Sequence, residues 1–73
     1  MNASVSIAIT VNGELRRCPP GLTLPQVLEQ LGYRPELVVV EFNGTIRSRS
    51  TWEGCVVVES DVLEVVTIVG GGS

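Results

Sequence analysis

Few residues of this 73-residue chain could take part in chemistry. Two cysteines, Cys18 and Cys55, could supply thiols, and eight acidic residues could supply carboxylates. The sequence has no histidine, and its five basic residues are all arginines. This composition excludes histidine-based acid–base catalysis, histidine metal sites, Ser-His and Cys-His nucleophile pairs, and lysine Schiff bases. We therefore expect no self-contained active site, so the chain is predicted not to be an enzyme.

The thiols and carboxylates are expected to be structural or solvated. Cys18 and Cys55 do not form a Cys-X-X-Cys motif, so buried thiols are predicted, with redox or persulfide sites as the alternative. The acids of the C-terminal half are not spaced as metal ligands, so they are predicted to be solvated or to meet a basic patch on a partner: Glu53, Glu59, Asp61 and Glu64. We expect no bound metal and no bound cofactor.

The last four residues are the unusual feature: Gly70, Gly71 and Gly72 are followed by Ser73. Three successive glycines contribute nothing to packing and are costly to order. They would form a thin thread that can enter a narrow channel and lie close to a bound nucleotide. A flexible, linker-like end is the alternative interpretation. We divide the chain into one domain, 1–69, and a flexible tail, 70–73.

Charge and hydropathy limit the partners and the location. The net charge is −3 and the isoelectric point is about 4.6, so nucleic acid and anionic lipid are not expected to bind. No apolar run approaches the ~20 residues that cross a bilayer, and the N-terminal residues do not resemble a signal peptide. A cytoplasmic protein with reduced thiols is the expectation.

The first half predicts a hairpin followed by a helix. Alternating apolar residues over 5–11 indicate a strand, and Asn12-Gly13 is typical of a two-residue hairpin turn. That turn sets Ile9 opposite Arg16 and Ile7 opposite Cys18, which places Cys18 on the core face. A helix over 23–31 follows from an apolar stripe at helical spacing, with Thr23 and Gln26 as its capping box.

The second half predicts mainly strands. Alternation over 38–42 and the turn Asn43-Gly44 indicate a second hairpin that continues into 45–47. A helical turn is expected over 50–53, a short strand or extended segment over 55–58, and a turn at 59–61. The final strand covers 62–69. A single helix covers only one face of a sheet, so the prediction is an α+β domain with a four- to five-stranded mixed sheet and the helix across one face.

The final strand is apolar on both faces. Leu63 and Val65 suffice for the core, yet three further apolar residues lie on the opposite side: Val62, Val66 and Ile68. This pattern fits a fully buried central strand or an exposed apolar strip that docks a partner protein. Trp52 could likewise pack under the second hairpin or anchor a partner. Arg47 and Arg49 could pair with a partner's acids or be solvated.

In order along the chain, these features resemble the ubiquitin-like β-grasp sulfur carriers of the ThiS type, which serve thiamine biosynthesis. The resemblance covers nearly the whole sequence and rests on these segments: Val11-Asn12-Gly13-Glu14, Pro20-Gly21-Leu22-Thr23, Leu28-Glu29-Gln30-Leu31-Gly32, Phe42-Asn43-Gly44, the pair Arg49 and Trp52, and the stretch from Asp61 to Gly72.

The resemblance implies a β-grasp fold and a function as a protein co-substrate. An E1-like adenylating enzyme would use ATP and magnesium to activate the Gly72 carboxylate. Sulfur from a cysteine desulfurase or another donor would convert it to a thiocarboxylate, which would supply thiazole synthase. Gly70 and Gly71 would thread into the partner, and the Val62, Val66 and Ile68 side chains would dock on it. The free chain would be a monomer.

Two other functions are compatible with this resemblance, and the sequence differs from the family pattern at two positions. The chain could serve molybdopterin or another sulfur pathway, or it could be a β-grasp interaction module that never carries sulfur. The family ends on glycine, whereas Ser73 follows Gly72 here, so Ser73 is removed, is foreign to the natural chain, or prevents carrier function. The family usually has glycine before Asp61, where this chain has Ser60, a residue that adopts a left-handed backbone less readily.

Overall fold

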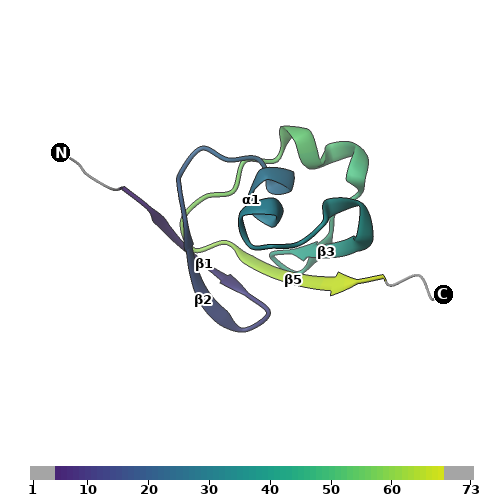
Figure 1. Ribbon diagram of the computed structural model, residues 1–73, viewed down its shortest axis with the longest axis horizontal. Helices are drawn as coiled ribbons and strands as arrows, with labels where there is room; N and C mark the ends of the chain where they lie inside the picture. The colour runs from purple at the N-terminus through teal and green to yellow at the C-terminus, as the bar shows by residue number, and fades with distance from the viewer. Residues whose placement is uncertain (1–4, 69–73) are drawn as a thin grey trace.

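The computed structural model describes residues 5–68, which form a five-stranded sheet with one α-helix across it (Figure 1). The strands are β1 (Ile7–Val11), β2 (Glu14–Cys18), β3 (Val38–Phe42), β4 (Thr45–Ile46) and β5 (Val62–Thr67). Their order is β2-β1-β5-β3-β4, with β5 parallel to β1 and antiparallel to β3. This arrangement confirms the predicted α+β class and the mixed sheet. The boundary at residue 69 and the tail lie outside the described residues, so that division of the chain stays a prediction.

The first hairpin has the predicted register. Asn12 and Gly13 both have positive φ angles, 52° and 83°, as a two-residue turn that follows the sheet twist requires. Ile9 therefore pairs with Arg16, and Ile7 pairs with Cys18. Cys18 is buried, at 3% exposure. The second strand thus contributes its last residue to the core.

Helix α1 (Leu24–Gln30) covers one face of the sheet (Figure 1). The backbone N–H of Thr23 donates to Gln26 Oε1 at 2.9 Å, which forms one arm of the predicted capping box. The helix is one residue shorter at each end than the predicted 23–31, because Thr23 and Leu31 are its cap residues. Gly32, with φ 92°, reverses the chain after it.

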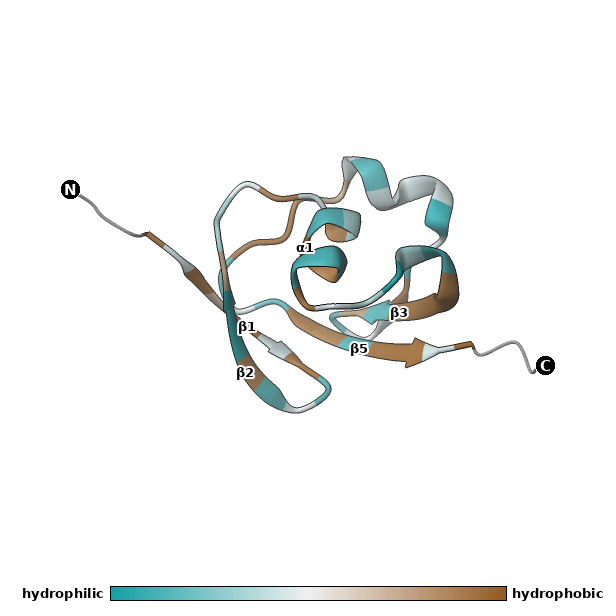
Figure 2. Ribbon diagram, viewed as in Figure 1, coloured by the Kyte–Doolittle hydropathy of each residue, from teal (hydrophilic) through white to brown (hydrophobic). Residues whose placement is uncertain are grey.

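The core lies between α1 and the sheet. Figure 2 shows hydrophobic residues along β3 and β5. The fourteen buried hydrophobic residues come from both halves of the chain: Ile9, Val11, Cys18, Leu24, Val27, Leu28, Val38, Val40, Phe42, Trp52, Cys55, Val57, Leu63 and Val65. The alternation predicted for 38–42 and the helical stripe over 23–31 both bury the expected residues.

Residues 55–58 fit the predicted extended segment: Cys55 has an extended backbone, and the one sheet-like contact of this segment is a bridge between Val56 and Thr23. Two other predictions for the second half need correction. The helical turn is a 3₁₀ helix, η2 (Arg49–Gly54), capped by Ser48 and two residues longer than the predicted 50–53. A second 3₁₀ helix, η1 (Pro35–Leu37), was not predicted; Pro35 ends α-helical periodicity but has a φ angle that suits a first helical turn. β5 is also shorter than predicted and ends at Thr67.

Both hairpin asparagines bind β5 through their side chains. Asn12 Oδ1 accepts the Val65 N–H at 2.7 Å, and its Nδ2 donates to the Val65 carbonyl at 3.2 Å. Asn43 Oδ1 accepts the Val62 N–H at 2.8 Å. The parallel pairing of β1 with β5 covers only Thr10 and Val11, so the Asn12 side chain continues the ladder where the backbone of β1 turns away.

The turn before β5 contains the two residues that depart most from expectation. Ser60 has a left-handed φ of 73°, which is the conformation that glycine would adopt more readily. Asp61 was predicted to be solvated, but it is 8% exposed. Its Oδ2 accepts the Val58 N–H at 2.8 Å, and its Oδ1 accepts Asn43 Nδ2 at 3.1 Å. Asp61 is therefore a buried cap of this turn.

The bridge from Asn12 to β5 gives a stability prediction. The variant Asn12→Gly keeps the left-handed turn but leaves both backbone groups of Val65 without their partner. We expect it to lower the free energy of unfolding by about 1–3 kcal/mol. Asn12→Ala should cost about 1 kcal/mol more, because alanine also resists the positive φ. Urea denaturation measures both, and an Asn12→Gly variant as stable as the parent would contradict the role of the side chain.

Candidate functional site

The predicted reacting end of the chain lies outside the structure's described residues. Gly70, Gly71 and Gly72, and the Ser73 that follows them, belong to the undescribed segment, so their roles stay predictions. What the structure describes is the segment that leads to them. Ile68 is the last described residue, and its N–H donates to the Leu37 carbonyl at 2.7 Å. In sequence, the first glycine is the second residue after Ile68.

The outer face of β5 carries the three residues predicted to dock a partner. Val62, Val66 and Ile68 are 41%, 61% and 49% exposed, whereas Leu63 and Val65 are 0% and 6% exposed. The strand thus has one face in the core and one open face. Within residues 5–68, α1 lies on the core side only (Figure 1). The alternative of a fully buried central strand is therefore wrong, although exposure does not itself test docking.

The open face extends across residues that the sequence analysis did not assign to it. Val39 on β3 pairs with Val66 in the ladder and is 39% exposed, and Ile46 on β4 is 67% exposed. A groove of about 310 Å³ lies among side chains from all three strands, namely Val39, Glu41, Ile46, Glu64 and Val66. The sequence indicated that Val39 could be exposed, because residues 38–40 are apolar on both faces of the strand. That Val39 lies beside Val66 follows only from the strand register.

Two carboxylates lie in the middle of this apolar face. Glu41 and Glu64 stand opposite each other in the β3–β5 ladder, and both are exposed. Like charges in directly opposed positions destabilise a sheet slightly. The face therefore offers a partner an apolar surface with a local negative charge.

The two cysteines are free and buried, which confirms the prediction of buried thiols. Burial raises the pKa of the Cys18 thiol above its ordinary value. Less of the thiol is then ionised at neutral pH, and the thiolate is the form that attacks sulfur or carbon. Any sulfur chemistry of this chain is thus better assigned to another group.

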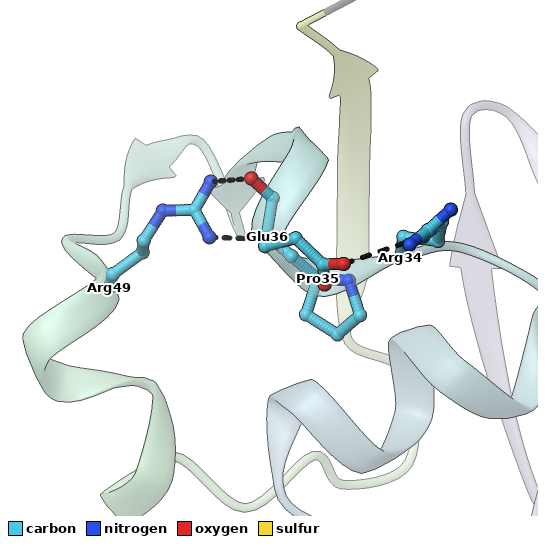
Figure 3. A network of polar contacts seen from close by, with 4 residues as sticks. All are labelled: Arg34, Pro35, Glu36 and Arg49. Carbon is cyan, nitrogen blue, oxygen red and sulfur yellow. Dashed lines mark hydrogen bonds and ion pairs between the residues drawn. The ribbon is translucent and has the colours of Figure 1, made fainter.

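The other candidate residues prove to be structural. Trp52 is 4% exposed and its Nε1 donates to the Arg47 carbonyl at 3.0 Å, so it packs inside the molecule and is not an exposed anchor. The Arg47 guanidinium lies 5.4 Å from the centre of the Phe42 ring. Arg49 is exposed, and its guanidinium donates to the carbonyls of Pro35 and Glu36 (Figure 3).

The acidic side chains do not assemble a metal site. Glu59 Oε1 accepts the Ala8 N–H at 3.0 Å, and Asp61 is committed to its turn. Within residues 5–68, no group of three or more potential ligands could hold a metal ion. Among the same residues, no helix is long and apolar enough to cross a bilayer.

Comparison with known proteins adds the family. Residues 9–72 match the ThiS family. The chain is 44% identical over 64 residues to a thiazole synthase of Magnetococcus marinus, a match that covers 88% of this chain and 20% of that protein. It is 33% identical over 67 residues to the ycf40 protein of Porphyra purpurea, with 92% and 94% of the two chains covered.

A solved structure agrees with these sequence matches. The crystal structure of the thiamine biosynthesis protein ThiS from Geobacter metallireducens superposes with a TM-score of 0.76 at 29% identity, covering 90% of this chain and all of that one. The chain spans about a fifth of the thiazole synthases that it matches. Since the family match covers residues 9–72 and the β-grasp folds agree, this chain belongs to the ThiS family.

Proposed function

We propose that this chain is the sulfur carrier of a thiamine pathway, and that its Gly72 carboxylate carries the sulfur. The observation that carries the proposal is the match to the ThiS family over residues 9–72, which extends into the glycines. The β-grasp fold shared with the Geobacter protein supports it. The absence of histidine and lysine from the sequence fits a co-substrate on which other proteins act.

The proposed chemistry needs a free carboxylate at Gly72 and therefore a chain that ends there. In the first step, the carboxylate oxygen attacks the α-phosphorus of magnesium-bound ATP, and pyrophosphate leaves. An E1-like adenylating enzyme would catalyse this step. The resulting acyl-adenylate is reactive because AMP is a good leaving group, whereas a carboxylate at neutral pH is inert toward sulfur.

The second step brings in sulfur. A persulfide supplied by a cysteine desulfurase or another donor attacks the acyl carbon, and AMP leaves. A thiol then attacks the donor's cysteine sulfur in the acyl disulfide, which forms a mixed disulfide with the donor and releases the thiocarboxylate on Gly72. That group would be the sulfur source for thiazole synthase. Because the enzymes would supply positioning and charge stabilisation, this chain needs only a recognisable surface and an accessible end.

The open face of the sheet is the proposed recognition surface. Val62, Val66 and Ile68 would dock on the partner, and Val39 and Ile46 would extend the contact. Burial of such side chains contributes roughly 25 cal/mol for each square ångström of apolar surface removed from water. Gly70 and Gly71 would then reach into the partner's active site, where side chains would obstruct a narrow channel.

Thiazole synthase as the receiving partner has separate support. In the Magnetococcus protein and in a second one from Paramagnetospirillum magneticum, a segment similar to this chain forms part of a polypeptide named thiazole synthase. Joining two proteins in one chain raises their effective concentration for each other. Such a joining is expected for a carrier and the enzyme that consumes its sulfur.

The direct test of the proposal is mass spectrometry of the reacting end. A chain ending at Gly72, incubated with ATP, magnesium, the adenylating enzyme and a sulfur donor, should gain the mass difference between one sulfur and one oxygen. A chain that retains Ser73 should stay unmodified, because its Gly72 has no free carboxylate. If the chain ending at Gly72 gains no sulfur under conditions that load a known ThiS protein, the proposal fails.

The docking face is tested with two neighbouring residues of β5. Val66→Asp places a charge on the open face, so the fold should persist while binding to the adenylating enzyme weakens by about tenfold or more. Val65→Asp is the matched control, because its side chain faces the core and should cost about 3 kcal/mol or more of stability. Circular dichroism and calorimetric binding measure these effects, and full-affinity binding by a folded Val66→Asp variant would exclude this face.

Deletion of residues 70–73 distinguishes a sulfur carrier from a protein that acts only as an interaction module. The shortened chain should bind the adenylating enzyme through the sheet face but accept no sulfur. If this shortened chain retained full biological activity in a strain that lacks the parent protein, the interaction module would be the correct function.

A further inference from the structure

Arg49 holds one short segment of backbone with an unusual number of bonds. Its Nη1 donates to the Pro35 carbonyl at 2.6 Å, and its Nη2 donates to the carbonyls of Glu36 and Val38 at 3.1 and 2.9 Å. Figure 3 shows the guanidinium turned toward η1, with two of these bonds drawn. A single side chain therefore fixes three of the four successive carbonyls from residue 35 to residue 38.

The remaining carbonyl of that run anchors the end of the central strand. The Leu37 carbonyl accepts the N–H of Ile68 at 2.7 Å. Because Val38 pairs with Thr67 in the antiparallel ladder, this bond is the next contact after the last ladder pair. Thus Ile68, the residue that follows β5, is bonded to a helix end whose neighbouring carbonyls accept hydrogen bonds from Arg49.

The helix end needs such support. η1 has only three residues, and short 3₁₀ helices have poor hydrogen-bond geometry and unsatisfied terminal carbonyls. The ion pair of Arg34 with Glu36, at 3.4 Å, joins side chains that are 75% and 61% exposed, so it adds little. Arg49 is better placed, because its guanidinium also stacks on Trp52, 5.1 Å from the ring centre, and its planar fork is pre-organised for several acceptors.

We propose that Arg49 is a positioning residue for the C-terminal tail. By holding the carbonyls on both sides of Leu37, it fixes the acceptor for Ile68 and thereby the point at which the chain leaves the sheet toward Gly72. This inference rests on the proposed function. Gly72 is the fourth residue after Ile68, so the fixed anchor limits the reach of the carboxylate to about 14 Å.

A fixed anchor matters because the partner must find both the sheet face and the end group. If the Ile68 bond opens, the last described contact moves back to Thr67, and the greater length of chain beyond it lets the end group sample a larger volume. Its effective concentration at the partner's active site then falls. Arg49 would contribute no atom to the reaction, and its effect would be purely on where the end group is presented.

Amide hydrogen exchange on the intact chain tests the first part. Arg49→Gln should raise the exchange rate of the Ile68 amide by about tenfold, while exchange inside the β3–β5 ladder changes by less than about threefold. Arg49→Lys, which keeps the charge but loses the fork, should give an intermediate result and serves if the glutamine variant does not fold. Arg47→Gln is the matched control, since Arg47 also stacks on a ring but lies on Phe42.

The second part uses the adenylation reaction. Arg49→Gln should lower kcat/KM for adenylation of the chain ending at Gly72 by about three- to tenfold relative to Arg47→Gln. The positioning role is overturned if Ile68 and the inner ladder amides accelerate equally, or if kcat/KM is unchanged while Ile68 opens. If the parent chain is never adenylated, the proposed function fails, but the exchange experiment still decides whether Arg49 anchors Ile68.

Discussion

The pairing of β5 on both sides is the constraint on which the rest of this structure depends. This strand joins the N-terminal hairpin to the C-terminal hairpin, yet its backbone pairing with β1 covers only two residues, Thr10 and Val11. Asn12 and Asn43 supply further contacts by bonding the backbone of Val65 and Val62. Because both asparagines also form the tight turns of their hairpins, two residues set the turn geometry and fasten the central strand. The sheet's core face, its open face and the exit of the chain all follow from the position of β5.

Local patterns were sufficient for most of the fold. The alternation over 5–11 and 38–42, the Asn-Gly turns and the capped helix all depend on residues close in sequence. The register of the first hairpin and the burial on β3 and α1 are confirmed, whereas β1 begins at Ile7 and leaves Val5 76% exposed. The features that were missed depend on distant residues. Asn12 reaches Val65 across 53 positions, and Asp61 reaches Asn43 across 18. A carboxylate in a polar stretch is predicted to be solvated unless the N–H groups that donate to it are known. The burial of Asp61 was therefore not predicted.

The candidate site was predictable in part for the same reason. Because alternate residues of a strand share a face, the sequence identified Val62, Val66 and Ile68 as one apolar strip. An apolar strip alone fits a buried strand equally well. The strip on β5 is exposed because α1 covers the opposite face of the sheet. Only the strand order shows that Val39 and Ile46 belong to the same open face. The role proposed for the glycines comes from family resemblance, since composition alone also fits a linker. A ThiS-family chain without histidine or lysine is consistent with a division of labour in which enzymes provide catalysis and the carrier provides a surface and an end group.

We propose that the open face of the sheet, and not the helical face, meets the adenylating enzyme. Cross-saturation NMR tests this most directly, by irradiating the enzyme and recording which signals of the isotope-labelled chain lose intensity in the complex. The account predicts the largest losses at the methyl groups of Val39, Ile46 and Val66. Losses centred on the solvent side of α1, at Gln26 and Glu29, with the sheet face unaffected, would contradict it.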